Sequence, residues 1–398
     1  MAQVLTVTIL SFFWIVTASS SFNVLDYGAI GDGKTDNSQA VLRAWEDLCG
    51  ATRGTPTLIV PAGGTFLLKP VRFQGPCKSK NLHIQIQGTI VASNNINAWG
   101  KDKGSWLQFS DVNGLIIDGG GQIDGQGGLW WKFCKEDKGC SRPTALSFHN
   151  CNGLQLSGLK HLNSQRNHIS INGCSDVNLF HLYITAPQDS PNTDGIDISA
   201  STHINIRNSV IRTGDDCIAI NGFSSYINIS GISCGPGHGI SVGSLGKNGA
   251  YETVEEVHVQ NCTFKGTQNG VRIKTWQGGA GYARKITFDN IILIASQNPI
   301  IIDQNYFCRF PYSAESSNVY ISDVTYRNIR GSSSVERAID LNCGRKRGCT
   351  NIVMDDIEIV PSSPGMHLHA FCNNAYGIST LASPTVPCLS NKFLDFFP

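Results

Sequence analysis

Four short polar clusters follow one another through the middle of the chain. The interval from Asp194 to Asp216 equals the interval from Asp216 to His238, and Arg272 follows after a longer interval that includes a Gly-rich insertion. If one turn of a solenoid takes about 22 residues, these groups stack into one column on one face. The clusters are Asn192-Thr193-Asp194, Gly214-Asp215-Asp216, Gly237-His238-Gly239 and Arg272-Ile273-Lys274. Carboxylates, a histidine and two cations together suit the acid–base cleavage of an acidic sugar polymer.

The three aspartates are the candidate acid and bases. Each one alone is an ordinary turn residue, because Asp beside Gly is common in turns. Stacked on neighbouring coils, Asp194, Asp215 and Asp216 would repel one another when ionised, which should raise at least one pKa and leave a protonated acid beside ionised bases. Asp215 and Asp216 are adjacent and would face opposite sides of a regular strand. We therefore expect a bend at a strand end, with both side chains reaching one cleft.

His238 and the two cations are the candidate partners of these acids. Glycines on both sides of His238 allow a tight turn, so it is either a plain loop histidine or a group that hydrogen-bonds the acid or the sugar. Arg272 and Lys274 are two positions apart and share one strand face, with Ile273 buried opposite. They are either a solvated strand edge or a site for a carboxylate that needs no metal.

A loose repeat of short alternating strands positions these residues. Late in the first hundred residues an apolar triplet followed by a turn containing Asn, Gly or Cys begins to recur, and from Leu154 to Val319 it recurs at steps of roughly 23 to 33 residues. This spacing predicts an all-β fold, a parallel β-helix, whereas a β-sandwich would show hairpin turns at steps of roughly 8 to 12 residues. The triplets begin at Leu115, Leu154, Val177, Ile204, Ile227, Val257, Ile286, Val319 and Ile352.

The two ends of a solenoid need caps against edge pairing. Residues Asp36 to Cys49 carry Val41, Ala44, Trp45 and Leu48 at helical spacing, which predicts a short N-terminal capping helix. The tail from Cys372 to Cys388 suits a disulfide loop, and no linker divides the chain after residue 21.

Composition indicates a secreted protein without a strong overall electrostatic field. The net charge of +1 offers nothing to recruit nucleic acid, and charged residues make up only 15% of the chain against roughly 25% in ordinary domains. The apolar run Val4 to Val16, followed by small residues, predicts a secretory signal peptide over residues 1–21, with a short membrane anchor as the alternative. We expect residues 22–398 to form one monomeric domain, free of the membrane once the signal is removed.

The cysteines support an oxidising compartment. All 14 follow the apolar run, and their number is even. The chain has no Cys-x-x-Cys pair, which would have suggested a metal site. The spacings of Cys134 to Cys140 and of Cys343 to Cys349 better suit short disulfide loops. Two sequons, at Asn228 and Asn261, would be open to glycosylation there.

The chain resembles the polygalacturonases, glycoside hydrolases that degrade pectin. The resemblance runs from Phe22 to the C-terminal cysteines, and four motifs match in order. They are Ser190-Pro191-Asn192-Thr193-Asp194-Gly195, Thr213-Gly214-Asp215-Asp216-Cys217, Cys234-Gly235-Pro236-Gly237-His238-Gly239 and Gly270-Val271-Arg272-Ile273-Lys274. The resemblance implies a single-stranded right-handed parallel β-helix, a disulfide between Cys217 and Cys234, and secretion to the cell wall or apoplast.

The resemblance also implies roles for the site residues. Asp215 would be the general acid, and Asp194 and Asp216 would activate the attacking water in an inverting reaction, with His238 tuning proton transfer. Arg272 and Lys274 would hold a galacturonate carboxylate, and Tyr306 matches a tyrosine of the same subsite. Asn192 is a further candidate for substrate binding.

The expected activity is hydrolysis of α-1,4-galacturonosyl linkages without cofactor or metal, with pectin as the partner and attack within the chain favoured. Attack from chain ends is one alternative. A calcium-dependent pectate lyase would eliminate rather than hydrolyse, and it fits His238 and the Asp215-Asp216 pair less well. A solenoid that only binds polysaccharide is poorly supported by an intact set of catalytic motifs. Rhamnogalacturonan hydrolases match the Arg272-Lys274 set less well.

Overall fold

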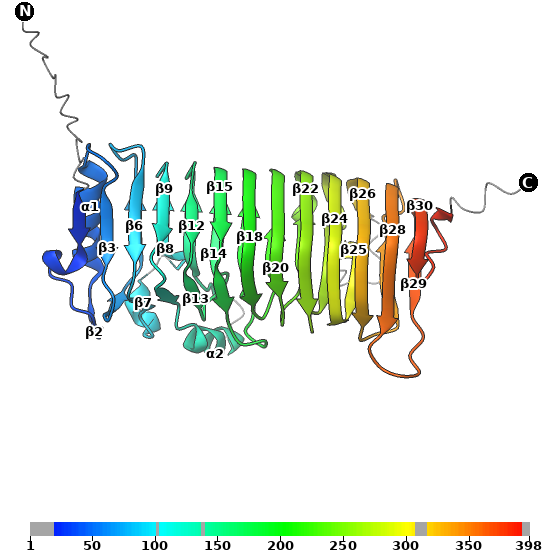
Figure 1. Ribbon diagram of the computed structural model, residues 1–398, viewed down its shortest axis with the longest axis horizontal. Helices are drawn as coiled ribbons and strands as arrows, with labels where there is room; N and C mark the ends of the chain where they lie inside the picture. The colour runs from blue at the N-terminus through cyan, green and yellow to red at the C-terminus, as the bar shows by residue number, and fades with distance from the viewer. Residues whose placement is uncertain (1–19, 101–102, 137–139, 307–316, 392–398) are drawn as a thin grey trace, which may run out of the picture.

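The chain folds into a right-handed parallel β-helix, confirming the predicted fold class. The computed structural model describes residues 20–100, 103–136, 140–306 and 317–391. Figure 1 shows the coils stacked side by side from the N-terminal to the C-terminal end, with each strand beside the strand of the next coil. The predicted signal peptide falls mostly outside the described residues, and β1 begins at Ser21.

Eleven of the described strands form the smaller sheet, which carries the chemistry discussed below. All its pairings are parallel, so each strand lies one coil from its neighbour. Its strands are β5 (Val71–Gln74), β8 (Ser105–Ser110), β11 (Thr144–His149), β14 (Ile169–Asn172), β17 (Ile196–Ser199), β19 (Ile218–Ile220), β21 (Ile240–Leu245), β23 (Asn269–Trp276), β25 (Asn298–Tyr306), β27 (Arg337–Asn342) and β29 (His369–Asn373).

The other 20 described strands form a larger, curled sheet that closes each coil. Its strands lengthen toward the C-terminal half, where single strands cover stretches that are split in two in the early coils. They are β1 (Ser21–Asn23), β2 (Asp32–Asp36), β3 (Thr57–Val60), β4 (Thr65–Leu68), β6 (Leu82–Ile86), β7 (Thr89–Ala92), β9 (Leu115–Asp118), β10 (Gln122–Asp124), β12 (Gln155–Ser157), β13 (Lys160–Leu162), β15 (Ser175–Phe180), β16 (Tyr183–Thr185), β18 (Thr202–Arg212), β20 (Ser224–Cys234), β22 (Tyr251–Lys265), β24 (Ala280–Ser296), β26 (Asn318–Ser333), β28 (Cys349–Pro361), β30 (Ala375–Ser383) and β31 (Ser390–Asn391).

In-register apolar ladders fill the interior. Alternate residues of each strand point inward, so like residues of successive coils stack on one another. One ladder is fully buried and runs through the smaller sheet as Ile196, Ile218, Ile240, Val271, Ile300 and Ile339. Stacked rings of Phe73, Phe109 and Phe148, with centroids 4.5 and 5.4 Å apart, continue the core toward the N-terminus. Burial of this kind holds the outward-facing residues in fixed columns.

One step of the predicted repeat is wrong. The triplet at Val319 does lie in a strand, β26, but Val319 pairs with Gly281, and the partner of Ile286 is Val324. The true step from Ile286 therefore ends at Val324 and is longer than the predicted step to Val319. Two apolar triplets, beginning at Val319 and at Val324, lie in β26, so apolar spacing alone could not show which of them stands opposite Ile286.

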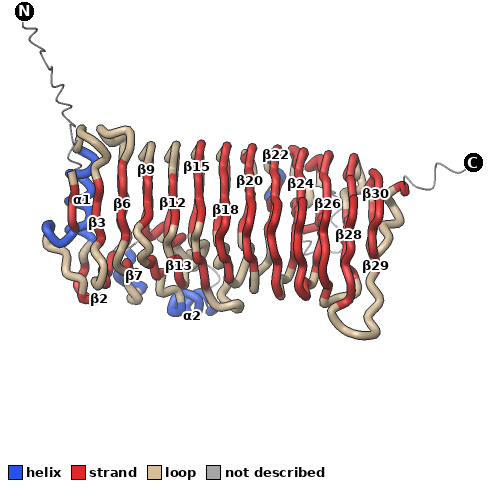
Figure 2. Tube along the Cα trace, viewed as in Figure 1, coloured by secondary structure: helices blue, strands red, loops and turns tan. Residues whose placement is uncertain are grey.

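Helices lie at the N-terminal end and beside the stack (Figure 2). The predicted capping helix is confirmed as α1 (Ser38–Gly50), whose buried face includes Val41, Ala44, Trp45 and Leu48. Asp36 accepts hydrogen bonds from the backbone and hydroxyl of Ser38 at the helix start. The second helix is α2 (Gly128–Glu136), and the short 3₁₀ turns are η1 (Val24–Tyr27), η2 (Ile96–Trp99) and η3 (Lys247–Gly249). None of the described helices has the length and apolar character to span a bilayer.

Ten cysteines form five disulfides, including every pair singled out from the sequence. The pairs are Cys49–Cys77, Cys134–Cys140, Cys217–Cys234, Cys343–Cys349 and Cys372–Cys388. Cys151, Cys174 and Cys262 are buried free thiols, and Cys308 lies outside the described residues. Both sequon asparagines, Asn228 and Asn261, are exposed.

Candidate active site

The predicted column of acids and histidine exists at one edge of the smaller sheet. Ile196, Ile218 and Ile240 are in register on β17, β19 and β21. A polar residue lies two positions before each of them, namely Asp194, Asp216 and His238. The equal intervals in sequence therefore place these three residues at equivalent points of successive coils.

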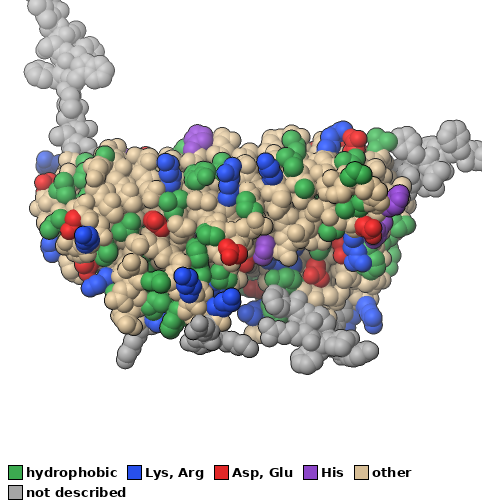
Figure 3. Space-filling model, turned by 90° about the horizontal axis from the view of Figure 1, so that it is seen from below, with side chains coloured by type: hydrophobic (Ala, Val, Ile, Leu, Met, Phe, Trp, Pro, Cys, Tyr) green, Lys and Arg blue, Asp and Glu red, His purple; other side chains and the backbone are tan. Residues whose placement is uncertain are grey.

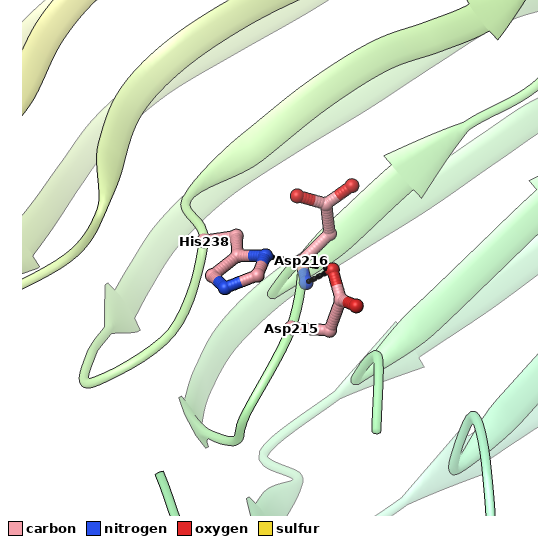
Figure 4. A group of neighbouring side chains, drawn as sticks. All are labelled: Asp215, Asp216 and His238. Atoms are coloured by element: carbon pink, nitrogen blue, oxygen red, sulfur yellow. Dashed lines mark hydrogen bonds and ion pairs between the residues drawn. The ribbon is translucent and has the colours of Figure 1, made fainter. Parts of the chain in front are cut away.

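Asp215 and Asp216 lie in the bend between β18 and β19, as the sequence led us to expect. The backbone amide of Asp216 donates to Asp215 Oδ1 over 2.8 Å, which holds the bend. Figure 4 shows the His238 ring facing the Asp215 carboxylate. The side chain of Asp215 is 17% exposed and that of Asp216 only 1%. Neither joins the apolar interior, since each has polar partners.

Asp216 is held by both predicted cations. Its Oδ1 accepts from Arg272 over 2.6 Å and from the Ser241 hydroxyl over 3.0 Å, and its Oδ2 accepts from Lys274 Nζ over 2.7 Å. Arg272 is not in the column of Asp216 and His238, because it pairs in register with Ser241, farther along the strand. Its side chain reaches back over the small residues Ser241 and Ala219, which occupy its own column. The expectation of one column for all four clusters is thus corrected for the cations.

Asp215 is the more accessible acid and has two side-chain partners. His238 Nδ1 lies 2.9 Å from Asp215 Oδ1, and Asn192 Nδ2 donates to Asp215 Oδ2 over 3.1 Å. The backbone also joins them, because the His238 amide donates to the Asp215 carbonyl over 2.8 Å. Gly239 permits this turn: its φ is +87°, and a Cβ there would lie 2.2 Å from the Asn269 carbonyl oxygen.

Arg142 is a site residue that sequence reasoning missed. Its guanidinium donates to the Pro191 carbonyl over 2.6 Å and to Asn192 Oδ1 over 2.7 Å. This orients the Asn192 amide so that its NH₂ group faces Asp215. Asn192 thus contacts Asp215, and its binding of substrate stays a prediction. No sequence motif identifies Arg142, which precedes β11 and lies 50 residues from Asn192 in sequence.

The pKa of one acid is raised as predicted, but that acid is not Asp215. Burial, followed by repulsion from Asp197, Asp215 and Asp216, raises the pKa of Asp194 well above its usual value. Burial and Asp216 likewise raise the pKa of Asp197, a carboxyl not singled out from the sequence, to about 7. For Asp215 burial works in the same direction, but the hydrogen bond and charge of His238 and the charge of Lys274 outweigh it, and its pKa is lowered. Asp215 is thus a stronger acid than Asp194 or Asp197, and Asp194 is a strong base once ionised.

Tyr306 ends β25 beside the two cations. Lys274 Nζ lies 5.2 Å and the Arg272 guanidinium carbon 5.9 Å from the centre of its ring. The Tyr306 ring also meets Trp276 edge-on, with centroids 5.7 Å apart. All eight predicted site residues therefore gather at one place: Asn192, Asp194, Asp215, Asp216, His238, Arg272, Lys274 and Tyr306.

Asp215, Asp216 and His238 are also the one group of described residues close enough to share a metal ion, with ligand atoms within 4.8 Å. Both carboxylate oxygens of Asp216 already accept from Arg272 or Lys274. A metal ion would have to displace these donors and would be repelled by their charges. The group is therefore better suited to an anion near Arg272 and Lys274 than to a cation.

Figure 3 shows one face of the molecule, on which acidic side chains and a histidine gather near the middle, with basic side chains to both sides. In the cluster itself, the cations on the C-terminal side of the acids are Arg272 and Lys274, both largely buried. On the N-terminal side the cations are Arg142 and Arg166. Burial and then the charge of Arg166 lower the pKa of Arg142, and the charge of Arg166 also opposes the rise in the pKa of Asp197.

Comparison with known proteins agrees with this geometry. Residues 49–382 match the family model described as glycosyl hydrolases family 28. A protein of Arabidopsis thaliana named as a probable polygalacturonase is 51% identical over 96% of this chain and 83% of its own length. An exopolygalacturonase of Zea mays is 41% identical over 90% of this chain and 88% of its own. Among solved structures, an endo-xylogalacturonan hydrolase from Aspergillus tubingensis superposes with a TM-score of 0.79 and 26% identity over 90% and 96% of the two chains.

Proposed function

The chain belongs to glycosyl hydrolases family 28 and is a glycoside hydrolase of the polygalacturonase family, and from this premise we propose that it hydrolyses α-1,4-galacturonosyl linkages of pectin by an inverting, metal-independent mechanism. The observation that carries the proposal is the Asp215–His238 pair beside Asp194 and the Asp216–Arg272–Lys274 cluster. Asp215 and Asp194 supply the acid and the base. Arg272 and Lys274 supply cations for the carboxylate that every galacturonate carries.

In this proposal Asp215 gives a proton to the glycosidic oxygen as the bond to the anomeric carbon breaks. The proton can be restored from His238, whose Nδ1 is 2.9 Å from Asp215 Oδ1. A lowered pKa makes Asp215 a strong donor, although fewer molecules carry its proton at any given pH. Substrate binding would counter that loss, because a galacturonate carboxylate at Lys274 would offset one of the charges that lower the pKa of Asp215.

Asp194 and Asp216 take the other half of the reaction. A water molecule attacks the anomeric carbon from the face opposite the leaving oxygen and passes a proton to a carboxylate, which gives inversion. Asp194 is the proposed proton acceptor, since its raised pKa makes it a good base when ionised. Asp216, fixed by Arg272 and Lys274, would orient the water. Because Asp215 must carry a proton, we expect the rate to be highest at mildly acidic pH.

We place the substrate across the cluster and not at one end of it. Cations lie on both sides of the acids, with Arg142 and Arg166 on the N-terminal coils and Arg272 and Lys274 on the C-terminal coils. Carboxylates of one polymer can thus be bound before and after the cleaved bond, which favours attack within the chain. Attack from chain ends is the second candidate, since one similar protein is named an exopolygalacturonase. Pectin as substrate would place a monomeric, secreted enzyme in the plant cell wall.

The products formed from polygalacturonic acid in the presence of a chelator test this function. We expect saturated oligomers to appear at an undiminished rate, because no step needs a metal. Unsaturated, ultraviolet-absorbing ends, or loss of activity with chelator, would instead identify a calcium-dependent lyase. No product together with retained binding would identify a polysaccharide-binding solenoid.

A further inference from the structure

A groove lies away from the acids, on the outer face of the larger sheet. Its volume is about 730 Å³, within the range of small-molecule sites. It is formed where β22, β24, β26 and β28 begin, just after the chain leaves the smaller sheet. The small residues Ala280 and Gly281 form its floor. Ala280 pairs with Tyr251 of the previous coil, and Gly281 has a φ of +113°.

Three tyrosines line this groove. Tyr282 and Tyr320 are in register on β24 and β26, so their outward side chains sit one coil apart, about 4.8 Å. Tyr251 stands at the rim and is 60% exposed. A tyrosine this exposed beside two others is the kind of surface that binds sugar rings, because each aromatic face offers a flat apolar area and each hydroxyl a polar edge.

The inner two rings are already fixed in place. The Tyr282 hydroxyl donates to Glu255 Oε1 over 3.3 Å, and the Arg284 guanidinium carbon lies 4.3 Å from the centre of the Tyr282 ring. The Tyr320 hydroxyl is 2.6 Å from the Thr350 hydroxyl. Ligand binding would therefore order few additional side chains, which lowers the entropic cost of association.

Arg347 is the group of this groove that can hold an acid. Arg284 is balanced by Glu255, 2.7 Å away, whereas the Asp323 carboxylate accepts hydrogen bonds from the neutral groups of Asn351 and Ser322 and keeps its charge. Arg347 also lines the groove and is exposed, and within the described residues it has no ion-pair partner. An exposed guanidinium next to aromatic faces suits a sugar that carries a carboxylate.

We propose that this groove is a secondary binding site for acidic oligosaccharide, which holds a stretch of galacturonan polymer on the face of the larger sheet while the acids of the smaller sheet cleave elsewhere. The choice of galacturonan as the ligand rests on the proposed function. The groove shares no residue with the catalytic cluster, so changes to it should affect capture of polymer and leave the chemistry intact.

Kinetics on long and short substrates test the proposal. In Tyr251→Ala and Arg347→Gln, we expect the KM for polygalacturonate to rise about three- to tenfold, the effect of losing one aromatic or charge-assisted contact. The kcat for polymer and both constants for trigalacturonide should stay as in the wild type. Tyr226→Ala is the matched control, because Tyr226 is also exposed (50%) on the larger sheet but stacks on His203 outside the groove.

Direct binding measurements separate the possible failures. Calorimetry with polygalacturonate on the Asp215→Asn background should show a weaker complex only when Tyr251 or Arg347 is also changed, and the neutral probe cellopentaose should bind at least tenfold more weakly. Equal polymer affinity in the groove variants and in Tyr226→Ala would overturn the second site while leaving the proposed function standing. Tight binding of the neutral probe would overturn the preference for an acid. A wild-type protein that neither cleaves nor binds polygalacturonate would remove the proposed function as well.

Discussion

At the scale of single residues, the proposed catalytic cluster holds its acids in different environments. Asp216 is almost fully buried and bound to two cations, whereas Asp215 is more accessible and pairs with His238 and Asn192. Within the described part of the chain Asp194 forms no ion pair, and burial with three neighbouring carboxyls raises its pKa. The pKa values of Asp194 and Asp215 are thus shifted in opposite directions, as a division into base and acid requires.

Arg142 should act on Asp215 through Asn192, as a positioning residue. Arg142→Gln removes both hydrogen bonds to the 191–192 segment and a positive charge that interacts with Asp215. We expect kcat to fall about tenfold, and the rate profile to shift to higher pH because Asp215 would hold its proton more tightly. Arg142→Lys keeps the charge but loses the paired N–H donors of the guanidinium, so its kcat should fall without the pH shift. An unchanged profile in both variants would remove Arg142 from the catalytic account.

Asp197 should make the protein less stable at alkaline pH. Its pKa in the folded state is raised to about 7 by burial and by Asp216, so its favourable contribution is complete below the unfolded pKa and is lost as pH rises through about 7. In Asp197→Asn the Tm should therefore decline less between pH 5 and pH 8 than in the wild type.

Asp289→Asn is the control of opposite sign. Arg327 lowers the pKa of Asp289, so this carboxylate stabilises the fold above its unfolded pKa, and the variant should lose stability at neutral pH. Thermal unfolding across the pH range measures both effects. A steeper alkaline loss in Asp197→Asn than in the wild type would contradict the assignment.

Sequence reasoning found the column of acids because equal intervals between motifs carry a geometric meaning in a solenoid. It could not find Arg142, whose contact with Asn192 spans 50 residues without a repeat. It also could not assign the raised pKa, which depends on burial and on Asp197, a residue outside every motif. The contact of Asn192 with Asp215 was out of reach for a similar reason, since only the structure shows which way its amide points.

At the scale of elements, the bends before β17, β19 and β21 carry the proposed site residues, and the paired strands behind them hold these bends in register. Glycine and a disulfide shape the bend before β21. A Cβ on Gly237 would lie 2.9 Å from the Asp215 carbonyl oxygen and 3.3 Å from Cys217 Sγ, so the bend packs directly against the Cys217–Cys234 disulfide. The position of His238 relative to Asp215 thus depends on this link.

Removing that disulfide should affect both stability and catalysis. For Cys217→Ala/Cys234→Ala, whose cysteines have a sequence separation of 17, we expect a loss of ~3 kcal/mol in the free energy of unfolding. The kcat should fall at least severalfold, because His238 is held less firmly. Cys49→Ala/Cys77→Ala, in the N-terminal cap, should cost stability but leave kcat unchanged. Equal kcat values for the two double variants would show that the disulfide near β21 serves the fold alone.

The repeat was predictable in kind but not in every step. Apolar alternation and turn residues identified the parallel β-helix and the capping helix α1. The coil between Ile286 and Val324 was misjudged, because β24 and β26 are long strands in which several triplets alternate equally well. Register in such strands is set by pairing with the previous coil, which is a three-dimensional property.

At the scale of the whole molecule, the stacked coils place cations on both sides of the acids, where a polymer could be held across them. With a net charge of +1, the protein has no strong overall attraction for a polyanion, so binding must come from local cations. Arg142 and Arg166 on one side of the acids and Arg272 and Lys274 on the other provide two such places.

This arrangement predicts attack within the polymer. The viscosity of a polygalacturonate solution should fall by half while only a few per cent of the linkages have been hydrolysed, because internal cuts shorten chains quickly. Viscometry together with a reducing-end assay measures the two quantities at once. Release of monomer from the first minutes, with viscosity falling only in proportion to hydrolysis, would indicate attack from chain ends.

The most direct test of the central claim is the rate of reducing-end formation from polygalacturonate by Asp215→Asn, measured in chelator beside the wild type. The substitution keeps the size of the side chain and removes its proton, so we expect turnover to fall by a factor of about 10² to 10⁴ with an unchanged Tm. A variant that folds and keeps most of the wild-type rate would contradict the assignment of Asp215 as the acid and with it the proposed mechanism.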